Sequence, residues 1–265
     1  MEYIDKNKSR EKAHKLIKEF LKECFDKQED CSADLYSVLK GNFKNDLKNI
    51  LLEDSNNHCC YCMRDLKGPT LEHVIPQKVK SQEDFSKYFE MDSRLDSENI
   101  MLEAEFIINP KETPPFPHTV AYENLIPSCF GTFASGSSKS CNNHRGDRFI
   151  QPLIFRENIH NEIKYKIDGS IVWSEDRADV FPTVNILGLN CLELKAIRRI
   201  WYYLSTHNLS CDESNKDRVI NDIITITEPQ EHGMLLNFKN KEYWNLLSQY
   251  TYFNNKKIFD DLISE

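Results

Sequence analysis

The chain has 265 residues, of which 40% are hydrophobic and 29% are charged, and its formal net charge is −8. This length suffices to bury a core without disulfides, and the composition is ordinary for a soluble globular protein. No run of about eighteen apolar residues occurs, and residues 1–6 contain no apolar signal-peptide core, so we expect a cytoplasmic protein with no membrane partner. The acidic balance argues against a long nucleic-acid interface formed by this chain alone, because such proteins normally carry a basic excess.

Residues 1–54 are expected to form an N-terminal helical segment. Two amphipathic helices are predicted there, over 8–28 and about 33–53, because apolar residues recur at three- and four-residue steps in both stretches. Their apolar faces are expected to pack against each other.

Residues 55–182 are expected to form a central segment rich in cysteine and turn residues. An apolar run at 71–75 has strand character, and a long mixed insertion occupies 78–123. Alternating apolar residues around Asp168-Gly169 predict a hairpin over 163–174.

Residues 183–265 return to a helical pattern. Helices are predicted near 192–204, 215–224 and 241–263 from the spacing of their apolar residues. Short strands between two helical segments predict an α+β fold, with the chemistry concentrated in the central segment.

Nine cysteines in a chain expected in the cytoplasm are better explained by metal ligation or buried thiols than by disulfides. Cys59 and Cys62 have the two-residue separation at which a tight turn directs both sulfurs at one ion. Cys129 and Cys141 are separated by eleven residues, so the Gly/Ser-rich segment between them must loop out. These four thiolates predict a structural zinc site whose loss unfolds its surroundings.

Other assignments remain open for this site. Cys129 and Cys141 taken alone also fit two unconnected buried thiols. His58 and His144 are alternative zinc ligands, whereas Cys60 lies inside the turn and is expected to point away.

Glu72 and His73 place a hard oxygen ligand next to an imidazole, and adjacent strand residues point to opposite faces. A Mg²⁺-type ion needs only a carboxylate and an amide oxygen from the protein, and Glu72 with Asn142 supplies these. His73 is the expected general base, since histidine needs the least tuning near neutral pH. Asn124 is expected to fix the orientation of the His73 ring.

A short helical stretch at 143–149 carries Arg145 and Arg148. We expect these arginines to contact the phosphates of a nucleic acid, although solvated surface arginines fit the pattern equally well.

Cys59-x-x-Cys62, Glu72-His73-x-x-Pro76, Asn124-Leu125-x-x-x-Cys129 and Cys141-Asn142-x-x-Arg145-Gly146 together resemble the HNH (ββα-metal) nucleases. In particular they resemble PtuB, the HNH component of Septu and retron-associated anti-phage systems. The resemblance is close over residues 56–155 and implies a ββα-metal core with a four-cysteine zinc knuckle. It implies His73 as general base, Asn124 as the residue that orients it, and Glu72 with Asn142 as ligands of catalytic Mg²⁺ or Mn²⁺. Asn142 stands where many relatives have His, so His144 is an alternative ligand.

The resemblance further implies an endonuclease acting on nucleic acid, with DNA as the expected substrate. It implies an ABC-type ATPase partner related to PtuA, and a retron reverse transcriptase with its RNA-DNA as a further partner. The acidic balance predicts weak DNA binding by the chain alone. A different class of function is a non-catalytic adaptor, in which the zinc site only holds helices for a partner protein.

Overall fold

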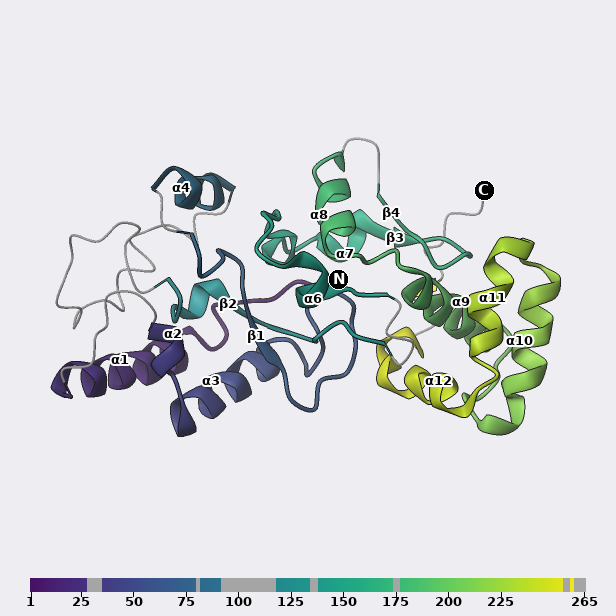
Figure 1. Ribbon diagram of the computed structural model, residues 1–265, viewed down its shortest axis with the longest axis horizontal. Coiled ribbons are helices and arrows are strands. Elements are labelled where there is room, and N and C mark those ends of the chain that lie inside the picture. Colours follow the sequence, from purple (N-terminus) through teal and green to yellow (C-terminus); the bar gives the residue numbers. More distant parts are fainter. Residues whose placement is uncertain are drawn as a thin grey trace.

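The structure is a computed structural model in which two small antiparallel sheets lie among helices (Figure 1). This architecture confirms the α+β prediction. The residues that it describes are 1–27, 35–79, 82–91, 118–133, 138–173, 177–254 and 258–259. The helices and strands in chain order are α1 (Arg10–Asp26), α2 (Leu35–Val38), α3 (Gly41–Asp54), β1 (Thr70–His73), α4 (Gln82–Met91), β2 (Leu125–Ser128), α6 (Cys141–Arg145), α7 (Ile159–Glu162), β3 (Ile163–Tyr165), β4 (Ile171–Trp173), α8 (Val180–Ile186), α9 (Leu192–Thr206), α10 (Lys216–Thr225), α11 (His232–Asn237) and α12 (Lys241–Leu246).

The N-terminal helices pack against each other, as their apolar spacing predicts. Ile17 of α1 and Leu47 of α3 are fully buried in one hydrophobic cluster. The prediction of one helix over about 33–53 is wrong, because this stretch is divided into α2 and α3. Gly41, where α3 begins, has a φ of +60°, a left-handed conformation that interrupts a continuous helix.

The β1–β2 pair lies between two hydrophobic clusters. Leu71 is opposite Pro127, and Glu72 is opposite Ile126 in the antiparallel register. Leu71 belongs to the cluster of α1 and α3, whereas Ile126 belongs to a larger cluster that contains the cysteines. Because side chains alternate along a strand, Glu72 and His73 leave β1 toward opposite faces, and both residues line one cavity at the end of this strand.

The end of β1 is set by the side chain of Asn124. The amide of Ile75 donates to Asn124 Oδ1 at 2.6 Å, and Asn124 Nδ2 donates to the Ile75 carbonyl at 3.0 Å. The strand character predicted at Val74 and Ile75 is therefore not realised, since a side chain takes the place of a neighbouring strand at this point.

The hairpin predicted over 163–174 is confirmed by strands β3 and β4. Lys164 is opposite Val172, and the turn between the strands contains Gly169 with a φ of +81°. The helices predicted near 192–204 and 215–224 correspond to α9 and α10.

The prediction of one helix over 241–263 is wrong over 241–254, and residues 255–257 and 260–263 of the predicted helix lie outside the described residues. α12 ends at Leu246, and 3₁₀ turns follow at Leu247–Gln249 and Thr251–Asn254. The buried residues Leu247, Tyr250 and Phe253 recur every three residues, the period of a 3₁₀ helix rather than an α-helix.

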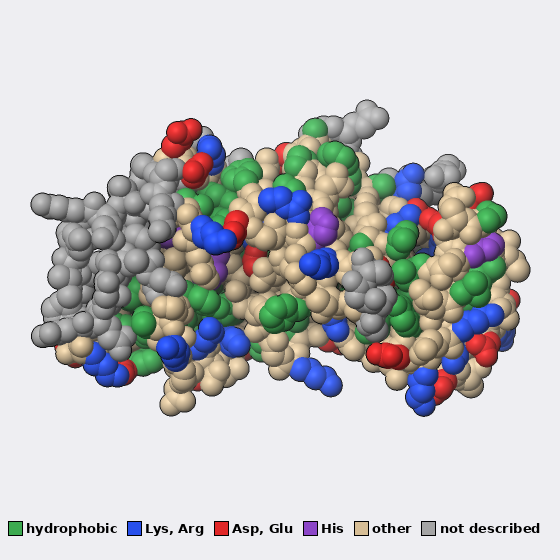
Figure 2. All heavy atoms as spheres, in the orientation of Figure 1, with side chains coloured by type: hydrophobic (Ala, Val, Ile, Leu, Met, Phe, Trp, Pro, Cys, Tyr) green, Lys and Arg blue, Asp and Glu red, His purple; other side chains and the backbone are tan. Residues whose placement is uncertain are grey.

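The larger hydrophobic cluster crosses the segment boundaries expected at 54 and 182. It contains Ile4, the cysteines of the central segment and Trp201 of α9. The C-terminal helices therefore share buried surface with the central segment. Charged side chains of both signs are scattered over the face shown in Figure 2, and Lys and Arg side chains lie near α3 and α6.

Candidate metal centre and catalytic site

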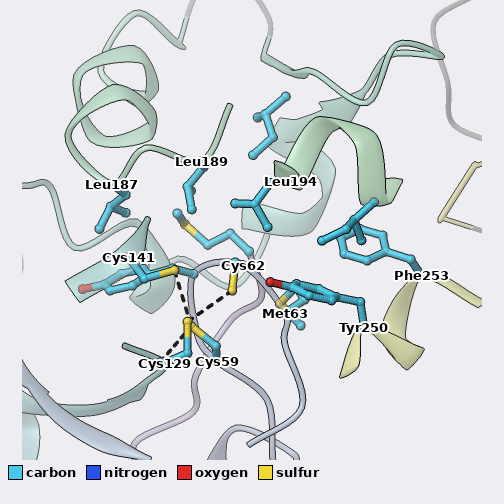
Figure 3. Packing of buried hydrophobic residues seen from close by; sticks show 14 of the residues in the cluster. Cys59, Cys62, Met63, Cys129, Cys141, Leu187, Leu189, Leu194, Tyr250 and Phe253 are labelled. Atoms are coloured by element: carbon cyan, nitrogen blue, oxygen red, sulfur yellow. Dashed lines mark hydrogen bonds between the residues drawn. The ribbon is translucent and has the colours of Figure 1, made fainter. Parts of the chain in front are cut away.

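Cys59, Cys62, Cys129 and Cys141 form one buried group of sulfur atoms, in which every pair lies within 4.8 Å. The Sγ atoms of Cys59 and Cys141 are 3.8 Å apart, and those of Cys62 and Cys129 are 3.6 Å apart. This confirms that the separated cysteines come together. Four thiolates at these distances fit a tetrahedral structural zinc ion. Figure 3 shows the group packed beneath hydrophobic side chains that include Leu187, Leu194 and Tyr250.

The eleven-residue separation is closed by a loop, as expected. The Ser140 amide donates to the Gly131 carbonyl at 2.9 Å, which brings the two ends of the loop together. Gly131 has a φ of +66°, and a Cβ at this position would lie 1.8 Å from the Ser140 carbonyl oxygen. Residues 134–137 of this loop lie outside the described residues. A glycine is therefore required for Cys129 and Cys141 to meet.

The alternative zinc ligands lie elsewhere. His58 Nε2 is 3.2 Å from a carboxylate oxygen of Asp65. His144 donates from Nδ1 to the Ile186 carbonyl at 2.8 Å. Cys60 is buried outside the group of four, and burial raises the pKa of its thiol well above the ordinary value. Among the described residues, only the four predicted cysteines form a set of this kind.

A separate cavity of about 230 Å³ brings together Glu72, His73 and Asn142. Glu72 and His73 come from the end of β1, and Asn142 comes from the first turn of α6. α6 also begins with Cys141 of the cysteine group, so this group positions Asn142. The lining residues are Leu71, Glu72, His73, Pro76, Gln77, Lys78, Asn142, Gly146 and Asp147.

The His73 ring is held in one tautomer. Its Nε2 lies 2.7 Å from the Thr119 carbonyl oxygen, and a carbonyl only accepts, so Nε2 carries the proton. Nδ1 therefore has the lone pair and lies 3.2 Å from the amide nitrogen of Gln77. Burial lowers the pKa of His73 to about 4, so the imidazole is neutral at physiological pH.

The Asn124 side chain forms no hydrogen bond with the His73 ring among the described residues, so it does not orient the ring through a direct hydrogen bond. Besides its two hydrogen bonds with Ile75, its amide donates to the His118 carbonyl at 2.7 Å. Asn124 thus joins the chain after β1 to the residue before Thr119. Because Thr119 supplies the acceptor for His73, any effect of Asn124 on the ring passes through this backbone.

Arg145 is buried, which corrects its expected role as a phosphate contact. Its guanidinium donates to Glu72 Oε1 and to the carbonyls of His73 and Val74, each at 2.6 Å. Burial raises the pKa of Glu72, and the charge of Arg145 opposes this rise without cancelling it. Arg145 therefore connects α6 to the end of β1. Arg148 is exposed but donates to the carbonyls of Arg145 at 2.9 Å and Ile186 at 3.1 Å.

Two groups at the site, Asp147 and the Thr119 carbonyl, were not predicted from the sequence. Asp147 lines the cavity and forms an ion pair of 2.6 Å with Lys78, which also lines it. Asp147 follows Asn142 by five residues and comes directly after Arg145-Gly146, and this position could have identified it in the sequence. No position in the sequence identifies the Thr119 carbonyl, because it belongs to the backbone of the long insertion.

Comparisons of this chain with protein-family models, with curated proteins and with solved structures found no match. Within the part of the chain that the structure describes, no helix combines the length and the apolar character needed to cross a membrane.

Proposed function

We propose that this chain is a metal-dependent endonuclease of the HNH (ββα-metal) type that hydrolyses phosphodiester bonds of nucleic acid, with DNA as the expected substrate. The observation that carries the proposal is the shared cavity of Glu72, His73 and Asn142. The order of β1, β2 and α6 is that expected for a ββα-metal core, and a group of four cysteines anchors α6.

The oxygen donors of the cavity fit a hydrated Mg²⁺ or Mn²⁺ ion. Arg145 binds Oε1 of Glu72, which leaves Oε2 for a cation, and Asn142 offers an amide oxygen. Such ions prefer oxygen ligands and retain several waters, so few protein ligands are needed. A bound ion would stabilise the negative charge that develops on the scissile phosphate.

His73 has the properties of a general base in this cavity. Its neutral imidazole carries a lone pair on Nδ1, which a water molecule would reach by displacing the Gln77 amide. As the water oxygen attacks phosphorus, its proton passes to Nδ1, and the phosphodiester bond to the leaving oxygen breaks. The Thr119 carbonyl then stabilises the positive imidazolium through Nε2–H.

A partner ATPase of the ABC type is part of this proposal, and so is a cytoplasmic role in anti-phage defence. The formal net charge of −8 supports a partner, because an isolated acidic chain binds nucleic acid weakly at physiological salt. A retron reverse transcriptase with its RNA-DNA is a further proposed component. An ATPase gene beside the gene for this chain would support the arrangement.

The variant His73→Ala tests the proposal against a zinc-stabilised adaptor. We expect it to retain zinc and its circular dichroism spectrum while losing Mg²⁺-dependent cutting of plasmid DNA, assayed alone and with the ATPase. His160→Ala is the matched control, because His160 is exposed and lies outside the cavity. Unchanged cutting by a folded His73→Ala variant would refute the catalytic role and favour the adaptor.

A further inference from the structure

Two lysines of α3 lie in a line of contacts that leads to His73. The Nζ atom of Lys44 lies 4.4 Å from the centre of the Tyr36 ring. The Tyr36 ring in turn meets the His73 ring edge to face, with centroids 4.7 Å apart. Lys48 follows Lys44 by one helical turn, and residues four apart share a face of a helix. The line therefore runs from Lys48 through Lys44 and Tyr36 to the cavity.

These two lysines form no ion pair with an acid within the described residues, unlike Lys12 and Lys78. Asp46 stands between them in the sequence, but residues two apart do not face each other on a helix. Partial burial lowers the pKa of Lys44, and the positive charge of Lys48 on the next helical turn lowers it further. Unrelieved repulsion of like charges favours a bound anion.

Further basic side chains lie near the cavity. Lys78 lines it and is ion-paired with Asp147, and the exposed Arg148 follows α6. Figure 2 shows Lys and Arg side chains near α3 and α6 on one face of the molecule. A chain with an overall acidic charge thus has two lysines close to His73 that form no ion pair with an acid among the described residues.

We propose that Lys44 and Lys48 bind the phosphate backbone of the nucleic-acid substrate and guide one strand to the cavity beside His73. This inference rests on the proposed nuclease function and identifies where its substrate binds. The two lysines are about 6 Å apart along the helix axis. This separation is close to the rise of two base pairs of B-DNA, about 7 Å, so both ammonium groups can follow one strand. They take the role that the sequence suggested for Arg145, which is buried.

The double variant Lys44→Gln/Lys48→Gln tests this surface. Binding of the full chain to a fluorescent DNA duplex is measured by anisotropy without added Mg²⁺, from about 50 to 200 mM salt. Loss of two phosphate contacts should reduce the slope of log affinity against log salt by about 1.8. Over this range the wild type should then lose about twelvefold more affinity than the variant. Lys15→Gln/Lys22→Gln on α1 removes two exposed lysines as the matched control and should keep the wild-type slope.

Several results would overturn the assignment. One is a slope of log affinity against log salt in the Lys44→Gln/Lys48→Gln variant that equals the wild-type slope. Another is a wild type that does not bind the duplex at about 50 mM salt with protein up to about 100 μM. Polyglutamate serves as a probe for an acidic protein. If the Lys44→Gln/Lys48→Gln variant lost polyglutamate binding but bound the duplex as the wild type does, the lysines would bind an acidic protein partner instead. Zinc content and circular dichroism verify folding, and Lys44→Arg/Lys48→Arg should retain the slope because it retains the charges.

The result of the duplex-binding experiment can be distinguished from the result of the test of the nuclease proposal. If the wild type never cuts but its duplex binding depends on Lys44 and Lys48, the surface stands and the catalytic proposal fails. If the wild type cuts through His73 while the double variant binds and cuts normally, the catalytic proposal stands and the surface assignment fails.

Discussion

The buried pair of Arg145 and Glu72 provides the strongest test of how this site is assembled. We expect Arg145→Met to destabilise the protein strongly, because it removes a charge-assisted hydrogen bond to Glu72 and the donors to the His73 and Val74 carbonyls. The Arg145 and Glu72 side chains have relative exposures of 0% and 7%. Little water is therefore available to replace the lost partner.

The expected loss of unfolding free energy is about 3–5 kcal/mol, the range for removing one partner of a buried ion pair. Adding Glu72→Gln to Arg145→Met should recover about 1–3 kcal/mol, since a neutral amide does not leave a charge buried without a counter-ion. The exposed Arg148 is the control, and Arg148→Met should cost less than about 1 kcal/mol.

Urea unfolding at several pH values measures these differences. Removal of Arg145 should raise the pKa of Glu72 further in the folded state, because burial then acts unopposed. A carboxyl whose pKa is higher in the folded state than in the unfolded state destabilises the fold above the folded pKa. This penalty disappears below the unfolded pKa. The cost of Arg145→Met should therefore be smaller at pH 5 than at pH 8.

Three results would contradict this reasoning. They are a cost below about 1 kcal/mol for Arg145→Met, an equal cost for Arg148→Met, and a cost for Arg145→Met that increases toward acidic pH. Any of these would mean that Arg145 leaves the buried position seen here and is available to a ligand.

Three further predictions concern the two centres. Cys129→Ser should lower the zinc content below one ion per chain and abolish cooperative thermal unfolding, whereas Cys60→Ser should retain the metal. Metal analysis measures the zinc content, and calorimetry measures the unfolding. Because the pKa of His73 is about 4, the rate of cutting should not decline through protonation of this base between pH 8 and pH 6. A pH profile of the cutting rate with a midpoint near 6.5 would contradict a buried neutral imidazole. Gly131→Ala should also reduce zinc retention, since its Cβ would collide with the Ser140 backbone, whereas Gly68→Ala is the control because its Cβ would lie in open space. Equal zinc content in the two variants would refute the role of the loop between Cys129 and Cys141.

The cysteine site was predictable because its signal is local. Two thiols separated by two residues specify a turn, and a loop rich in Gly and Ser returns a second pair to it. The grouping of Glu72, His73 and Asn142 was likewise expected from residue types that suit one metal-dependent reaction. Hydrophobic periodicity identified α1, α9 and the β3–β4 hairpin for the same reason.

The amino-acid sequence alone thus determined the four sulfurs that could hold a metal ion, helices α1, α9 and α10, and three of the residues that line the cavity. Only the tertiary structure decided how their polar atoms are partnered. It buries Arg145 against Glu72, gives His73 the Thr119 carbonyl rather than Asn124, and places Lys44 of α3 over the Tyr36 ring that contacts His73. These partners come from distant parts of the chain, and burial and hydrogen bonding are satisfied only when those parts pack together.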